Sequence, residues 1–132
     1  MIYGIGTDIA KVSRFERWVT NTPLISRFFA EEEVFTGSFD KNISPACQHY
    51  AARFAAKEAF AKALGTGFVG LTLKDFWITK DREGKPSFAF GEATEKLLAR
   101  RVGPCRVYLS ISHEKEYATA FVVIEKREGE AD

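Results

Sequence analysis

The clearest pattern in the chain is an alanine-rich, proline-free run over residues 53–67. Alanine, leucine, lysine and glutamate favour an α-helix, and glycines such as Gly65 and Gly67 are typical of a helix end. Upstream, Ser44 and Pro45 form a start signal, with serine as the N-cap and proline at the first helical position. The pattern therefore predicts one helix of roughly 20 residues that begins near Ser44 and ends near Gly65.

The predicted helix has two different sides at helical spacing. A smooth side, which a sheet or another helix could approach closely, consists of Ala52, Ala55, Ala56, Ala59 and Ala63. The other half is expected to face away from that contact and carries Arg53, Lys57, Glu58 and Lys62. Glu58 and Lys62 also have the i, i+4 spacing of an ordinary surface ion pair, so the spacing alone leaves a purely structural explanation open.

The rest of the chain alternates between strand-like and helix-like patterns. Strands are predicted over residues 2–9, 71–80, 87–90, 106–112 and 117–124. Further helices are predicted over residues 12–19, 24–29, 31–35 and 92–101, with a loop over residues 37–45. This order predicts an α+β fold, a mainly antiparallel sheet covered by one long central helix and several short helices. We expect residues 1–126 to form a single domain and residues 127–132 a charged C-terminal tail.

Composition narrows the possible functions. With 19 basic and 18 acidic side chains, the net charge of +1 gives no overall electrostatic attraction for nucleic acid or an anionic membrane. No run approaches the length of a membrane span, and the N-terminus resembles no secretory signal. Two cysteines are too few for a disulfide framework, so we expect reduced thiols in a cytoplasmic protein. The 12 phenylalanines could fill a core or mark a surface that is buried in an oligomer.

Two carboxylates and several glycines indicate a possible site for phosphate and a metal ion. Asp8 ends the first predicted strand, after Gly4 and Gly6, which leave the backbone uncovered. These glycines could equally lie under a packed helix, with Asp8 merely ending the strand. Together with Glu58 and the glycine-rich exit after the long helix, Asp8 suits phosphate and a hard metal ion, because magnesium is typically held by one or two carboxylates, waters and phosphate oxygens.

Five segments, taken in order, resemble a known family. They are Gly4-Ile5-Gly6-Thr7-Asp8-Ile9, Arg53-Phe54-Ala55-Ala56-Lys57-Glu58-Ala59-Phe60, Lys62-Ala63-Leu64-Gly65-Thr66-Gly67, Gly84-Lys85-Pro86 and Ser110-Ile111-Ser112-His113. The chain resembles the 4′-phosphopantetheinyl transferases, specifically their short holo-acyl-carrier-protein synthase group, from residue 2 to about residue 125. No single segment is specific, but their colinearity is.

The resemblance implies an activity. Such an enzyme transfers the 4′-phosphopantetheine arm of coenzyme A to a serine of apo acyl carrier protein, releases adenosine 3′,5′-bisphosphate and supports fatty acid biosynthesis. By this similarity, Asp8 and Glu58 bind Mg2+ together with the pyrophosphate, and Glu58 also helps a metal-bound water to act as the base toward the serine. Lys62 neutralises the phosphate of the departing nucleotide. This division fits phosphoryl transfer, which depends mainly on positioning and charge compensation.

The resemblance also implies binding residues for the two substrates. For coenzyme A they are Arg53, Lys62, Gly65, Gly84, Lys85, Pro86, Ser112 and His113. Within this set, Gly65 would admit the pyrophosphate, the turn at 84–86 would lie beside the adenine, and Ser112 and His113 would hold phosphates. Relatives tend to carry extra basic residues just before the long helix; here residues 44–50 lack them, so the 3′-phosphate is assigned to Arg53 and His113. Such enzymes are usually homotrimers with sites between subunits.

The acidic carrier protein would meet Arg14 and Phe54 by the same resemblance, since arginines around an apolar spot can orient an acidic partner. Two alternatives remain open at this stage. One is a nonenzymatic module that binds coenzyme A or an acidic protein, which would not need Asp8 and Glu58 near one metal ion. The other is nucleic-acid binding, which the mixed charges disfavour. Likewise, residues 84–86 could be just a hairpin turn.

Overall fold

The computed structural model describes residues 1–38 and 42–127. Its strands are β1 (Ile2–Lys11), β2 (Phe76–Lys80), β3 (Pro86–Phe90), β4 (Cys105–His113) and β5 (Tyr117–Lys126). Its α-helices are α1 (Thr22–Phe28), α2 (Ser44–Leu64) and α3 (Glu92–Arg101), and short 3-10 helices are η1 (Val12–Arg17), η2 (Glu31–Glu33) and η3 (Leu73–Asp75). Within these ranges, no helix is long and apolar enough to cross a membrane.

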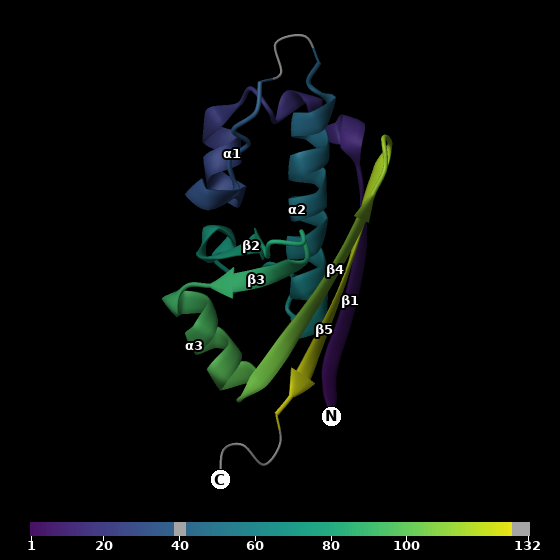
Figure 1. Ribbon diagram of the computed structural model, residues 1–132. Helices are drawn as coiled ribbons and strands as arrows, with labels where there is room; N and C mark the ends of the chain where they lie inside the picture. Colours follow the sequence, from purple (N-terminus) through teal and green to yellow (C-terminus); the bar gives the residue numbers. More distant parts are fainter. Residues whose placement is uncertain (39–41, 128–132) are drawn as a thin grey trace.

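The strands form two antiparallel sheets on either side of α2. The larger sheet has the order β1-β5-β4, and β2 and β3 form a separate hairpin. Figure 1 shows α2 between the three-stranded sheet and a second layer made of α1, the hairpin and α3. The predicted α+β fold with a long central helix is confirmed.

Two glycines allow α2 to lie directly on β1. A Cβ atom on Gly6 would overlap the carbonyl oxygen of Ala59, and one on Gly4 would overlap that of Ala63. The glycine side of β1 therefore faces the helix, and Ile5 and Ile9 point to the other side of the sheet, where each is 61% exposed. Because strand residues alternate between faces, Asp8 lies on the same face as the glycines and is directed toward α2.

The charged half of α2 is less exposed than the sequence predicts. Lys57 was expected among solvent-facing charges, but its side chain is 0% exposed and forms a 2.7 Å ion pair with Glu33. Its ammonium group also donates to the carbonyl oxygens of Leu73 and Phe76, at 2.6 and 2.7 Å. The reason is that α2 lies between two layers, so the middle of the helix has partners on both sides.

Several element boundaries differ from the predicted ones, and two of the differences have a visible local cause. The strand predicted from residue 71 begins only at Phe76, because Leu73–Asp75 forms a 3-10 turn whose Asp75 carboxylate accepts hydrogen bonds from Thr94. Ser44 is the first residue of α2 rather than its N-cap, and its N–H donates to the Asn42 side chain. Residues 39–41 of the predicted loop and 128–132 of the predicted tail lie outside the described residues.

Candidate functional site

Three of the predicted site residues meet where β1 crosses α2. The ammonium group of Lys62 lies 3.0 Å from Asp8 Oδ1 and donates to the carbonyl oxygen of Thr7 at the same distance. Asp8 keeps 18% of its side-chain surface exposed, and Lys62 keeps 52%. The glycine contact between strand and helix places these charges together, since it brings the two backbones close just before Asp8.

Glu58 belongs to the same group of charges. Burial raises the pKa of the Glu58 carboxyl above its ordinary value, and the negative charge of Asp8 raises it further. The positive charges of Lys62 and Arg14 act in the opposite direction. Two carboxylates separated by 50 positions in the sequence thus influence each other electrostatically, on a partly exposed surface.

The pair of carboxylates fits a hard divalent cation. A cation between Asp8 and Glu58 would remove their mutual repulsion, and magnesium commonly takes one or two carboxylates while keeping waters or phosphate oxygens as its other ligands. The described residues contain no cluster of three or more His, Cys, Asp or Glu side chains that could hold a metal ion. The donor set is therefore suited to an ion that shares its ligands with a substrate, rather than to a closed structural site.

Asp8→Asn is expected to lower the pKa of Glu58. The substitution removes a negative charge that raises this pKa, so the Glu58 carboxyl should titrate closer to its ordinary range. Carbon-detected NMR titration of the glutamate side chains would measure the shift, with the remote, exposed Glu95→Gln as a control that leaves Glu58 unchanged. An unaltered Glu58 titration in Asp8→Asn would show that the two carboxylates do not share a site.

A pocket of about 440 Å³ lies on the other side of α2. It is bounded by α2, the β2–β3 turn and the end of β4, and its lining includes Arg53, Gly84, Pro86 and His113 from the predicted set. His113 pairs with Ala118, whose side of the sheet is buried, whereas Ser112 pairs with Thr119 and lies on the opposite face. The structure therefore brings His113, and not Ser112, to the pocket.

The pocket is electropositive. Burial lowers the pKa of His49 to about 4, helped by the charges of Arg53 and Lys80 and opposed by a hydrogen-bonding contact with the Glu33 carbonyl. Burial also lowers the pKa of Arg53, whose Nη1 donates to the His49 carbonyl at 3.3 Å. The Nε of Arg53 is buried without a hydrogen-bond partner among the described residues. A partly buried guanidinium with an unused donor is suited to phosphate.

The remaining predicted coenzyme residues lie in two turns. Gly65 ends α2 with a φ of +85°, and Gly84 has a φ of +86° in the hairpin turn, a conformation that favours glycine at both positions. Lys85 is exposed, and its backbone N–H donates to Asp81 Oδ1 at 2.9 Å, which stabilises the turn. Arg101 donates from Nε to the carbonyl oxygen of Leu64 and so holds the end of α2 beside Gly65.

The two predicted partner-binding residues are stacked rather than side by side. Phe54 is only 4% exposed and packs against Phe15 and Trp18. The guanidinium carbon of Arg14 lies 5.0 Å from the centre of the Phe54 ring. Direct contact of Phe54 with a partner, as predicted, does not agree with this burial; the ring supports Arg14, which is itself exposed.

The two groups of site residues lie at opposite edges of the three-stranded sheet. Asp8 is on the edge strand β1, and His113 is on the edge strand β4. A second hollow of about 320 Å³ at the β1 edge is lined by Asp8, Lys62 and residues of the uncovered sheet face, and it shares no lining residue with the pocket at Arg53. One chain thus presents two separate groups of predicted site residues.

A sequence model described as the 4′-phosphopantetheinyl transferase superfamily matches residues 4–122. The chain belongs to this superfamily. The holo-[acyl-carrier-protein] synthase of Treponema denticola is 44% identical over 127 residues, which cover 95% of this chain and 99% of that protein. The match thus extends over almost all of both proteins.

Solved structures of superfamily members have the same fold. The holo-[acyl-carrier-protein] synthase of Neisseria meningitidis has a TM-score of 0.81 and 41% identity, covering 96% of this chain and all of that one. The enzyme of Bacillus anthracis, solved in complex with CoA (3′,5′-ADP), has a TM-score of 0.74 and 34% identity, covering 96% and 98% of the two chains.

For this superfamily member, sequence reasoning missed two residues of the pocket, His49 and Lys80. Lys80 pairs with Pro86 in the hairpin, so the strand register could have placed it beside the predicted turn. His49 precedes Arg53 by one helical turn, which puts both on the same side of α2. No pattern in the sequence shows that this side of the helix borders a pocket.

Proposed function

We propose that this protein transfers 4′-phosphopantetheine from coenzyme A to a serine of apo acyl carrier protein, giving holo acyl carrier protein and adenosine 3′,5′-bisphosphate. The observation that carries the proposal is the convergence of Asp8, Glu58 and Lys62 at the contact of β1 with α2, in a chain that matches holo-[acyl-carrier-protein] synthases over almost its full length. A module that only bound coenzyme A would not require this group of charges.

The group of charges can perform the transfer. The serine oxygen of the carrier forms a bond to the β-phosphorus of the coenzyme A pyrophosphate, and the bond from that phosphorus to the bridging oxygen breaks. The Glu58 carboxylate takes up the serine proton. Lys62 compensates the negative charge on the departing nucleotide. Asp8 and Glu58 would hold Mg2+, which would supply further charge compensation at the pyrophosphate.

The pocket at Arg53 would hold the nucleotide end of coenzyme A. Arg53 and His113 bind its phosphates, and Lys80 adds a cation that the sequence-based assignment lacked. Gly84 and Pro86 border the adenine, with Lys85 exposed in the same turn. Gly65, at the end of α2, leaves room for the pyrophosphate. Ser112 lies on the opposite face of the sheet and does not line this pocket.

We propose a homotrimer with sites between subunits. The sheet face opposite α2 carries exposed apolar side chains, and Figure 1 shows no element over it. These side chains are Ile5, Ile9, Tyr108 and Phe121. This apolar face lies between the group of charges at Asp8 and the pocket at Arg53. Such an arrangement suits a closed ring, in which the β1 edge of one subunit meets the β4 edge of the next. Each complete site would then combine the carboxylates of one chain with the nucleotide pocket of its neighbour.

Phe121→Glu is expected to convert the assembly to monomers. Phe121 is 55% exposed in the centre of the apolar face, and a buried, unpaired carboxylate there would be costly. Light scattering coupled to size-exclusion chromatography would give the mass. Val69→Glu is the matched control, because Val69 is also exposed but lies outside the sheet. A trimer that persists in Phe121→Glu, or a monomeric wild type, would contradict this assembly.

Arg14→Glu is expected to raise the KM for the carrier about tenfold and to leave the KM for coenzyme A unchanged, because a repulsive charge would replace one that attracts an acidic partner. Steady-state kinetics with each substrate varied in turn would separate the two constants. Arg100→Glu on α3 is a control that makes the same charge change far from the proposed surface. An unchanged carrier KM would remove Arg14 from the interface.

Intact-mass spectrometry tests the function itself. The protein is mixed with apo acyl carrier protein, coenzyme A and Mg2+, and the carrier should gain one phosphopantetheine. Reactions with a chelator, and with Mn2+ in place of Mg2+, test the metal requirement. Bound coenzyme A without any carrier product, on a carrier that another holo-[acyl-carrier-protein] synthase modifies, would favour the nonenzymatic module. We further propose that the reaction serves fatty acid biosynthesis in the cytoplasm, where a knockdown should accumulate apo carrier.

A further inference from the structure

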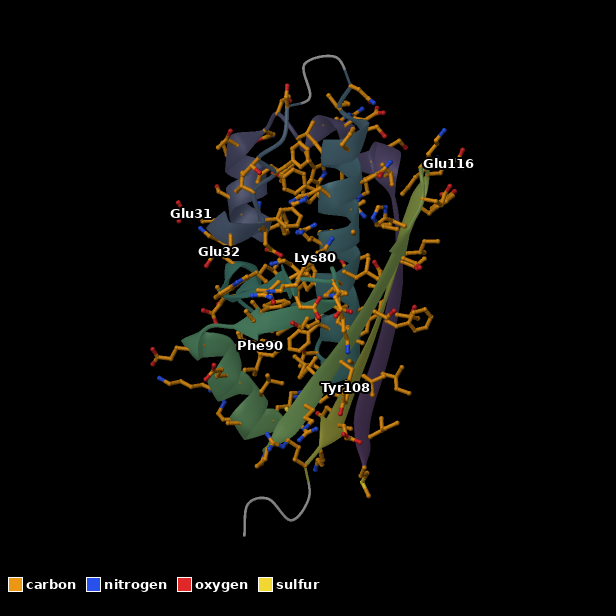
Figure 2. The ribbon with its side chains drawn as sticks, viewed as in Figure 1. Glu31, Glu32, Lys80, Phe90, Tyr108 and Glu116 are labelled. Atoms are coloured by element: carbon orange, nitrogen blue, oxygen red, sulfur yellow. The ribbon has the colours of Figure 1, made fainter. Side chains whose placement is uncertain are left out.

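Glu33 is a fully buried carboxylate to which the proposed reaction assigns no part. Its Oε1 lies 2.7 Å from the ammonium group of Lys57 and accepts a hydrogen bond from the N–H of Ala30 at 3.0 Å. Its Oε2 accepts from the N–H of Ile78 at 3.2 Å. The neighbouring Glu31 and Glu32 are exposed, and Figure 2 shows both pointing away from α2. Glu33 alone of this 3-10 turn reaches the interior.

Two partners of Glu33, Lys57 and Ile78, belong to the helix and the strand that border the nucleotide pocket, although neither lines it. Lys57 follows Arg53 by one turn of α2, so both side chains leave the same side of the helix. Ile78 precedes Lys80 by two residues in β2, which gives both the same orientation in the strand. A single carboxylate thus connects the helix that carries Arg53 to the strand that carries Lys80.

Two further contacts connect Glu33 to the pocket. The carbonyl oxygen of Glu33 is in hydrogen-bonding contact with Nε2 of His49, which lines the pocket. The negative charge of Glu33 also raises the pKa of Arg53, against the effect of burial, and so helps Arg53 to stay charged. The backbone and the side chain of Glu33 therefore act on the same wall.

Stability alone does not explain a charge at this position. Buried ion pairs commonly contribute little net stability compared with apolar residues of similar volume. The carboxylate instead provides hydrogen bonds in defined directions. It accepts from two backbone N–H groups and from one ammonium group, and these three donors belong to separate parts of the fold. An apolar side chain would fill the space but would accept none of these bonds, so the contact of Lys57 with the Phe76 carbonyl oxygen would have to hold β2 to α2 without the Ile78 contact.

We propose that Glu33 is a positioning residue that sets the separation between Arg53 on α2 and Lys80 on β2, and with it the affinity of the pocket for the 3′-phosphorylated nucleotide of coenzyme A. The inference rests on the proposed function, because it assumes that this pocket binds the nucleotide. Glu33 itself touches no substrate.

Glu33→Gln is the principal test, because it keeps the shape but removes one acceptor and the charge. Calorimetry with adenosine 3′,5′-bisphosphate should show affinity weakened about tenfold, and the KM for coenzyme A should rise by a similar factor. Turnover at saturation should stay within about twofold, and the KM for the carrier should not change. The preference for coenzyme A over dephospho-coenzyme A should fall, since Arg53 would no longer be aligned with the 3′-phosphate.

Two controls separate positioning from stability. Glu32→Gln makes the same change on the exposed side of the turn and should alter nothing. Leu98→Ala removes a buried side chain of α3 that lines no part of the pocket, so it should lower stability without weakening nucleotide binding. Wild-type nucleotide affinity in folded Glu33→Gln, or an equal loss of affinity in Leu98→Ala, would overturn the inference.

Other readouts keep the test decisive if Glu33→Gln does not fold. Glu33→Asp keeps the charge beside Lys57 but shortens the reach, and the same loss of affinity is expected. In the wild type, adenosine 3′,5′-bisphosphate should slow hydrogen exchange at the Ile78 amide more than at the Val122 amide of the main sheet; equal slowing would count against the proposal. A wild type that modifies the carrier while Glu33 variants bind normally would leave the proposed function intact and remove only the positioning role.

Discussion

Glu58→Gln is expected to reduce phosphopantetheine transfer at least about 100-fold while leaving the protein folded. Glutamine can neither accept the serine proton nor contribute a negative charge to a divalent cation. Without a bound cation, burial and the charge of Asp8 raise the pKa of Glu58, and a divalent cation beside the carboxylate would act in the opposite direction, so the activity that is lost at low pH should recover as the Mg2+ concentration is raised. Single-turnover measurements across pH and Mg2+ concentration, with carrier modification followed by mass, would show both effects.

The same substitution should not destabilise the protein at neutral pH. Because the folded-state pKa of Glu58 lies above its unfolded value, the folded protein binds more protons in this range, and stability falls as the pH rises through the two values. Glutamine cannot ionise, so the midpoint of chemical unfolding of the Glu58→Gln protein should equal or exceed that of the wild type. Near-normal turnover with Mg2+ would contradict the role of Glu58. Glu95→Gln on α3 is the control for a generic loss of charge.

Gly6→Ala is expected to lower the free energy of unfolding by about 3 kcal/mol or more. The added methyl group would overlap the Ala59 carbonyl oxygen, and a helix backbone cannot rotate away as a flexible side chain can. Chemical unfolding followed by circular dichroism would measure the change. Thr7→Ala is the control, because the side chain of Thr7 is on the exposed face of the same strand and points away from the helix.

Activity in Gly6→Ala should fall further than stability alone explains. If β1 moves away from α2 to accept the methyl group, Asp8 moves with it, and the ion pair with Lys62 lengthens. Measuring transfer at a temperature where the variant remains folded would isolate this effect. An unchanged unfolding midpoint and normal activity would mean that the strand and the helix are not in direct contact.

The sequence was sufficient for the long helix and for the group of charges at its side. One requirement, a close contact between helix and strand, accounts for three patterns: the alanines of α2, the glycines at its end and the glycines before Asp8. Local patterns could not show which face of β1 that contact uses. Ile5 and Ile9 look like core residues in the sequence, yet the helix needs the glycine side, so the isoleucines face outward.

The burial of Lys57 and the form of the pocket at Arg53 depend on longer-range packing. A lysine beside a glutamate in a helix is normally a surface residue, and its partner Glu33 lies in a segment of three consecutive glutamates that look alike. Only the position of η2 against α2 selects one of them for burial. The pocket likewise depends on the register of a hairpin against α2, which no local pattern contains.

The absence of side chains at Gly4 and Gly6 has a consequence for how this fold can vary. Main-chain atoms, and not interchangeable side chains, determine how far Asp8 lies from Glu58 and Lys62. Aromatic residues elsewhere in the interior can be exchanged and repacked without changing that distance. The spacing of these proposed catalytic residues is thereby protected from substitutions in the surrounding core, whereas these two glycine positions cannot accept even a single methyl group.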